Sequence, residues 1–186
     1  ASNTEIPRRW ELVNAGAVSI PHDLILTGVD ATHVNSGTIT MTTGDLAVTM
    51  TGTTPSFTNT GTITLAAGRT MSVSAGLLDL SAGLVQGSTA FLTTTGSPTV
   101  RFSTATVQPR IGFAAGTVLP DPFVIPATDS LRIYSGTFAP PSLTNNGRLF
   151  LEGNTVLTTV LTTGPGSLLR VRGTNTTSAA NVTITN

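Results

Sequence analysis

The stretch Phe57-Thr58-Asn59-Thr60-Gly61-Thr62-Ile63-Thr64-Leu65 decides the fold. From Thr62 to Leu65, hydroxyl residues alternate with aliphatic ones, which is the pattern of a strand with one buried face. Asn59 and Gly61 come just before this strand, and both residue types favour turns. The stretch therefore predicts a corner followed by a short, half-buried strand.

The same pattern, Asn-x-Gly-x-apolar-x-apolar, recurs along the chain. Its copies begin at Asn14, Asn35, Asn59 and Asn145, and their glycines are Gly16, Gly37, Gly61 and Gly147. The first three copies start 21 and 24 residues apart, and a second alternating run follows each of them. A near-constant spacing of this kind indicates a structural repeat. A degraded further copy is expected to begin at Ser74.

A unit of about 20 to 25 residues with two or three short strands cannot bury a core alone, but stacked copies can. The sequence therefore predicts an all-β fold, a parallel β-solenoid (β-helix) of about seven or eight coils. Ile39 would then lie between Val18 and Ile63, and the repeated asparagines and glycines would form a corner ladder. The alternative is a β-sandwich of jelly-roll type, which leaves the repeat unexplained.

The expected organisation is a short first segment and one long domain. Residues 1–13 would be an N-terminal cap or docking segment, and residues 14–186 the β-solenoid domain, with an irregular middle at 81–142 that contains several prolines. The first segment holds Arg8, Arg9 and Trp10. Because an open solenoid end exposes unpaired strand edges, this segment is expected to cover the first coil or to dock on another subunit.

Composition narrows the function classes. The chain has 186 residues, nine arginines, no lysine, 37 threonines, no cysteine and zero net charge. Without a basic cluster we expect no nucleic-acid partner, and without about 20 consecutive apolar residues we expect no membrane span. No cofactor or metal is expected, since cysteine is absent and no cofactor motif occurs. The threonine-rich, lysine-free composition favours a secreted or cell-surface protein.

Few residues of the chain are candidates for a catalytic role. His22 and Asp23 are adjacent, and neighbours in a strand point to opposite faces, which is poor geometry for a base and its orienting group. Asp23 and Asp45 are expected at the same corner of successive coils, with Arg69 one coil further. Glycoside hydrolysis needs two carboxylates, but a surface charge ladder explains this column more simply. We expect no enzymatic activity, with a polysaccharide lyase or glycoside hydrolase as the alternative.

Threonines expected to point outward suggest a third alternative function, ice binding. Thr38 and Thr40 occupy the same positions in the repeat as Thr62 and Thr64. A flat file of such pairs resembles an ice-binding solenoid, although two rungs make a short file. Thr is also common on the exposed face of ordinary strands.

The Asn-x-Gly copies, clearest at residues 57–65, resemble the degenerate coil repeats of bacterial surface β-solenoids. The relatives in question are filamentous-haemagglutinin-like adhesins and autotransporter passenger domains, and the likeness covers residues 14–80 and 143–160. The resemblance implies a secreted, extracellular, mostly non-enzymatic protein. We therefore expect a structural or adhesin module that assembles head to tail into a filament or binds a surface glycan or host ligand. Polysaccharide-binding or polysaccharide-cleaving and ice-binding functions are the alternatives.

Overall fold

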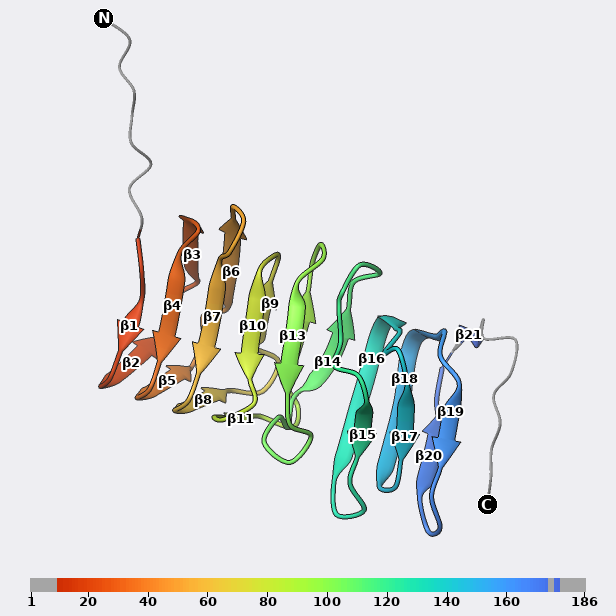
Figure 1. Cartoon of the computed structure of the whole chain (residues 1–186). Coiled ribbons are helices and arrows are strands. Elements are labelled where there is room, and N and C mark those ends of the chain that lie inside the picture. The colour runs from red at the N-terminus through yellow and green to blue at the C-terminus, as the bar shows by residue number, and fades with distance from the viewer. Residues whose placement is uncertain (1–9, 174–175, 178–186) are drawn as a thin grey trace, which may run out of the picture.

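The computed structural model describes residues 10–173 and 176–177 and contains only strands, turns and irregular segments there. The strands follow one another in coils that stack along one axis, as Figure 1 shows from red to blue. Every pair of neighbouring strands within the described part is parallel. The predicted parallel β-solenoid is confirmed, and the sandwich alternative is wrong, because each strand pairs with its counterpart one coil away.

The coils build four sheets. Sheet A contains β1 (Val13–Asn14), β4 (Thr32–Asn35), β7 (Ser56–Asn59), β10 (Leu77–Leu80) and β13 (Thr99–Phe102). Sheet B contains β2 (Ala17–Ile20), β5 (Thr38–Met41), β8 (Thr62–Leu65) and β11 (Leu84–Gln86).

Sheet C runs through every coil, whereas sheet D belongs to the C-terminal coils alone. The strands of sheet C are β3 (Leu24–Val29), β6 (Leu46–Thr51), β9 (Thr70–Val73), β12 (Phe91–Thr94), β14 (Arg110–Phe113), β16 (Ser130–Phe138), β18 (Arg148–Leu157) and β20 (Leu168–Val171). A short strand, β21 (Thr176–Thr177), also pairs with β18. Sheet D consists of β15 (Phe123–Ile125), β17 (Leu143–Asn145) and β19 (Leu161–Thr163).

The alternating residues stack into apolar columns, as the repeat predicts. Ile39 pairs in register with Val18 on one side and Ile63 on the other, and Met41 lies between Ile20 and Leu65. Ile39, Ile63 and Met41 are fully buried. Each buried side chain thus removes apolar surface from water at both neighbouring coils, which is the main source of stability in a solenoid.

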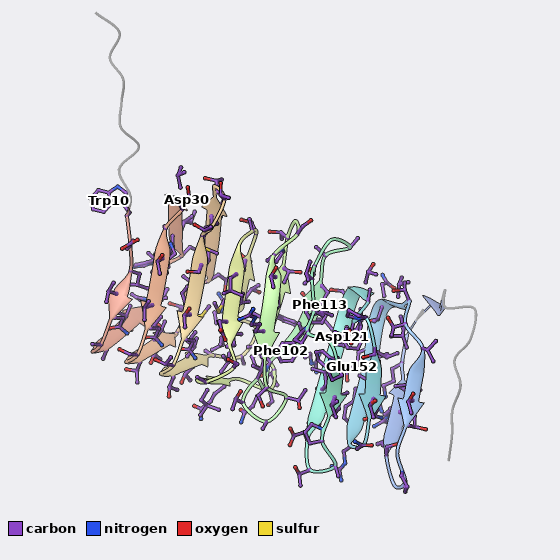
Figure 2. All side chains as sticks on the ribbon, in the orientation of Figure 1. Trp10, Asp30, Phe102, Phe113, Asp121 and Glu152 are labelled. Atoms are coloured by element: carbon purple, nitrogen blue, oxygen red, sulfur yellow. The ribbon has the colours of Figure 1, made fainter. Side chains whose placement is uncertain are left out.

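The middle of the chain changes the cross-section. Sheet A ends at β13 and sheet B at β11, and sheet D starts at β15. These changes fall within residues 81–142, which contain the strands β11 to β16. Four phenylalanines fill the interior here, with ring centroids of neighbouring pairs 5.4 to 6.5 Å apart: Phe102, Phe113, Phe123 and Phe138. Large rings take up the space where regular aliphatic columns are interrupted. Figure 2 labels two of the four, Phe102 and Phe113, near the middle of the solenoid.

The copy expected to start at Ser74 is wrong in its register. Leu77, Leu78 and Asp79 pair with Ser56, Phe57 and Thr58 in sheet A, not with the strand that begins at Thr62. Gly83 takes the place of Gly61 at the corner of this coil, close to Asn59, and Leu84 pairs with Thr62. Strands on all faces share the same alternation, so the pattern alone does not distinguish one face from the next.

Candidate functional site

An asparagine ladder occupies the corner between sheets A and B. Asn14 Nδ2 donates to Asn35 Oδ1 at 2.7 Å, and Asn35 Nδ2 donates to Asn59 Oδ1 at 2.7 Å. Asn35 and Asn59 are fully buried. Their amides also reach backbone carbonyls at the corner, so Asn14 donates to Thr38 O at 3.0 Å. The ladder satisfies polar groups that the corner would otherwise bury without partners.

Asn145 does not extend this ladder. It lies in sheet D between Ile125 and Thr163, because the motif has advanced by one face in the C-terminal coils and its corner leads into sheet C. Its Nδ2 donates to Leu168 O at 3.1 Å, but its buried Oδ1 has no hydrogen-bond partner. In the preceding coil the equivalent residue is Ile125, whose side chain has no hydrogen-bond donor.

Glycine is required at the repeated corner for steric reasons. A Cβ on Gly37 would lie 2.0 Å from Gly16 O, and a Cβ on Gly61 would lie 2.0 Å from Gly37 O. A Cβ on Gly147 would lie 2.2 Å from Pro126 O. Gly16, in the first coil, has open space at the same place. The glycines therefore permit close approach of stacked coils.

The carboxylates of the predicted acidic column bind backbone groups. Asp23 Oδ1 accepts the Asp45 N–H at 2.9 Å, and Asp45 Oδ1 accepts the Thr70 N–H at 3.0 Å. Arg69 Nη1 lies 3.5 Å from Asp45 Oδ1 and donates to Thr43 O at 2.6 Å. The three residues do come together at one corner, where each carboxylate caps the next coil. His22 is exposed beside them.

The threonine file is two rungs long in the structure as well. Thr38 pairs with Thr62, and Thr40 pairs with Thr64. The neighbouring rungs on this sheet are Ala17 and Ser19 on one side and Leu84 and Gln86 on the other. Thr64 Oγ1 donates to Gln86 Oε1 at 3.3 Å. The flat face therefore does not continue past these two coils.

Sequence reasoning missed a cluster on the outer face of sheet C. Glu152 Oε2 lies 3.6 Å from Arg110 Nε, and Glu152 Oε1 lies 3.7 Å from Arg132 Nη1. Arg132 stacks over the Phe150 ring, with its guanidinium carbon 4.9 Å from the centroid. Phe91 and Tyr134 pack beside them with centroids 4.8 Å apart. These residues come from different coils, so no local motif marks them.

A polar cavity of about 450 Å³ adjoins this cluster. Asp129 and Arg132 lie in its lining, together with Gln108 and several hydroxyl residues. Asp129 Oδ2 accepts from Thr104 Oγ1 at 2.8 Å, and Asp129 Oδ1 accepts from Thr128 Oγ1 at 2.9 Å. The cavity thus presents a carboxylate, a guanidinium and hydroxyl groups to solvent, a set suited to a polyhydroxylated ligand.

The first coil carries a mostly apolar cavity of about 300 Å³, lined by Trp10, Leu12, Ile25, Leu26 and His33 together with Glu11 and Thr27. Trp10 is 68% exposed and projects at this end of the solenoid (Figure 2). Arg8 and Arg9, the other residues of the expected assembly segment, lie outside the described residues. The exposed Trp10 ring and the apolar side chains at the end of the core thus line the same cavity.

His33 is buried in the second coil, and one of its two ring nitrogens has no hydrogen-bond partner. Its Nδ1 accepts the Leu12 N–H at 3.0 Å, which places the ring hydrogen on Nε2, and Nε2 has no partner. Burial lowers the pKa of His33, while the charge of Glu11 raises it to a smaller extent. A neutral imidazole with one unused donor therefore lines the apolar cavity.

Within residues 10–173 and the pair 176–177, no three His, Asp or Glu side chains gather as a metal site. No helix in that part of the chain has the length and apolar character to cross a membrane.

Comparison with protein-family models, with curated proteins and with solved structures finds no match for this chain. Its likeness to bacterial surface β-solenoids therefore consists of two features, the style of the repeat and the stacked parallel coils.

Proposed function

We propose that this protein is a non-enzymatic structural module of a secreted or cell-surface assembly, such as a fibre, a stalk or an adhesin. The observation that carries the proposal is the continuity of sheet C, whose eight stacked strands run from β3 to β20. At about 4.8 Å between strands, they span roughly 34 Å along the axis. A rod whose coils all share one sheet suits a spacer that holds other parts at a distance.

The two ends support assembly from head to tail. In the described residues, β1, β2 and β3 each have a partner strand on one side only, and so do β19 and β20. Unpaired strands present rows of backbone N–H and C=O groups that another chain can complete. Exposed apolar side chains accompany them, with Val13 and Ile25 at one end and Val171 at the other.

The acidic column supports a structural role over polysaccharide cleavage. Asp23 and Asp45 each accept a backbone N–H of the following coil, and Asp45 also faces Arg69. A glycosidase needs one carboxyl held protonated to serve as acid and a second carboxylate across a bound sugar. Capping of backbone N–H groups explains the presence of these carboxylates without a catalytic role.

Polysaccharide binding is the second candidate function, and the polar cavity beside the outer cluster favours it. The guanidinium in its lining, that of Arg132, stacks over the Phe150 ring, and sugars combine hydroxyl edges with apolar faces. A surface glycan bound here would make the solenoid an adhesin. Loss of glycan binding in Asp129→Asn, with binding kept in Asp79→Asn, would support this site.

Electron microscopy of the purified protein at rising concentration tests the main proposal. Uniform fibres one solenoid wide are the expected result, and dispersed particles of a single size at high concentration would contradict head-to-tail assembly. Enzymatic activity is tested separately with a panel of polysaccharides. We expect no cleavage by the wild-type chain; cleavage that disappears in the Asp23→Asn/Asp45→Asn double variant would assign an enzyme instead.

A further inference from the structure

The two ends of the described solenoid differ in charge. Residues 10–60 contain four carboxylates and no arginine, whereas residues 153–173 contain two arginines, Arg170 and Arg172, and no carboxylate. The carboxylates are Glu11, Asp23, Asp30 and Asp45. Opposite charges on two surfaces steer them together and set their orientation. The described N-terminal coils of one copy therefore complement the described C-terminal coils of another; Arg8 and Arg9 precede them and lie outside the described residues.

The register of sheet C places two of these charges in one column. Successive pairs link the inward residues Leu24, Leu46, Met71, Leu92, Ile111, Ile133, Leu151 and Val171. The residue before each of them forms the adjacent outward column, which begins at Asp23 and ends at Arg170. A further coil stacked in the same register would bring Asp23 next to Arg170 and Leu24 next to Val171.

The chain already contains an ion pair of this kind. Arg69 and Asp45 lie near the same corner in neighbouring coils, with 3.5 Å between Nη1 and Oδ1. Asp23 and Arg170 are both exposed, and Val171 is 52% exposed at the end of the apolar column. Stacking a second copy would cover Val171 and bring the two charges into adjacent coils. Within the chain the ion pair is offset by one residue, because Thr70 and not Arg69 is in register with Asp45.

The cavity at the first coil points to the same partner. Its lining is mostly apolar, with Glu11 as the charged residue. Trp10 and Ile25 are exposed there, and His33 contributes an unused Nε2 donor that is almost fully buried. A buried donor without an acceptor is unusual and costs free energy. A second copy placed on this end would cover the apolar side chains and bring backbone carbonyls near the cavity.

We propose that a second copy of this chain docks on the first coil with its β20 parallel to β3, so that sheet C continues from one molecule into the next. In this arrangement Arg170 of each copy pairs with Asp23 of the following one, and Val171 packs on Leu24. The inference rests on the proposed head-to-tail function and specifies its contact. It goes further by fixing the direction, the sheet and the register of assembly.

A charge-swap experiment tests the contact. Asp23→Arg and Arg170→Asp each place like charges at the junction, so each variant alone should need a roughly tenfold higher concentration to assemble. Mixed in equal amounts, the two variants should assemble again, because every junction then joins one variant's end to the other's. Asp79→Arg is the matched control: Asp79 also caps a backbone N–H, that of Ser81, but lies midway along the solenoid. Sedimentation velocity measures assembly, and circular dichroism verifies that each variant is folded.

The outcomes separate the two proposals. If the wild type assembles but the charge variants behave like Asp79→Arg, the register inferred here is wrong while head-to-tail assembly stands. If the wild type stays monomeric at every concentration, both are wrong. Should Asp23→Arg fail to fold, Asp23→Asn keeps an oxygen that accepts the Asp45 N–H and removes only the charge. That variant should still assemble several-fold less readily than the wild type, and unchanged assembly would overturn the inference.

Discussion

Asn35 donates its side-chain amide to Asn59 Oδ1 at 2.7 Å, one coil further along the axis, and accepts in the same way from Asn14. This hydrogen bond joins coils through side chains at a corner where the strands turn. It makes the asparagine column a second connection between coils beside the backbone ladders. Because both residues are fully buried, each amide depends on its neighbours for partners.

Replacing the middle rung should destabilise the solenoid. Asn35→Leu removes both side-chain bonds and leaves buried Asn59 Oδ1 without its donor, so we expect a loss of about 2 to 3 kcal/mol in the free energy of unfolding. Asn145→Leu is the control, since Asn145 already has an unpartnered Oδ1 and loses one bond to Leu168 O. Its loss should stay within about 1 kcal/mol. Urea unfolding compares them, and equal losses would contradict the ladder's importance.

Adding a methyl group at the corner should separate stacked coils. Gly37→Ala places a Cβ 2.0 Å from Gly16 O, which requires backbone movement, and we expect a loss of about 2 kcal/mol or more. Gly16→Ala adds the same atom in open space and should change stability by less than about 0.5 kcal/mol. Thermal unfolding followed by circular dichroism measures the difference. A Gly37→Ala variant as stable as Gly16→Ala would show that the coils are not packed at this distance.

Removing the charge of Glu152 should leave two arginines without their shared partner. Glu152→Gln is expected to cost about 1 to 2 kcal/mol, because the carboxylate is only 19% exposed and neutralises both Arg110 and Arg132. Arg69→Gln, which removes a more exposed pair, should cost no more than about 1 kcal/mol. Urea titrations at low and high salt provide the measurement. The result would be contradicted if Arg69→Gln proved the more harmful substitution.

The regular part of this fold could be predicted from sequence, and the irregular part could not. Alternation and the recurring Asn-x-Gly corner fix the first three coils, because each repeat carries its own strand and turn signals. The phenylalanine cluster at Phe102, Phe113 and Phe123 replaces those columns where the cross-section changes, and its residues follow no fixed spacing. Sequence reasoning also missed the Glu152 cluster, because the register that joins it arises only once distant coils stack.

Lowering the pH should weaken the first coils through His33. Burial holds the pKa of His33 below its ordinary value of 6.5, so just below pH 6.5 the unfolded chain binds more protons than the folded one. The free energy of unfolding should therefore fall as the pH drops through 6.5 and level off below the folded-state pKa. Glu11 is the charged group that faces the ring. Phe57 from β7 and Ile25 and Leu26 from β3 are apolar.

The two histidines provide a matched pair for this test. His33→Leu removes the buried group and should abolish the loss of stability between pH 7 and pH 5, whereas His22→Leu, at an exposed turn, should leave it intact. Protonated Nδ1 cannot accept the Leu12 N–H, so amide hydrogen exchange at Leu12 should quicken on acidification in the wild type and in His22→Leu. An unchanged pH profile in His33→Leu would show that other groups govern the acid response.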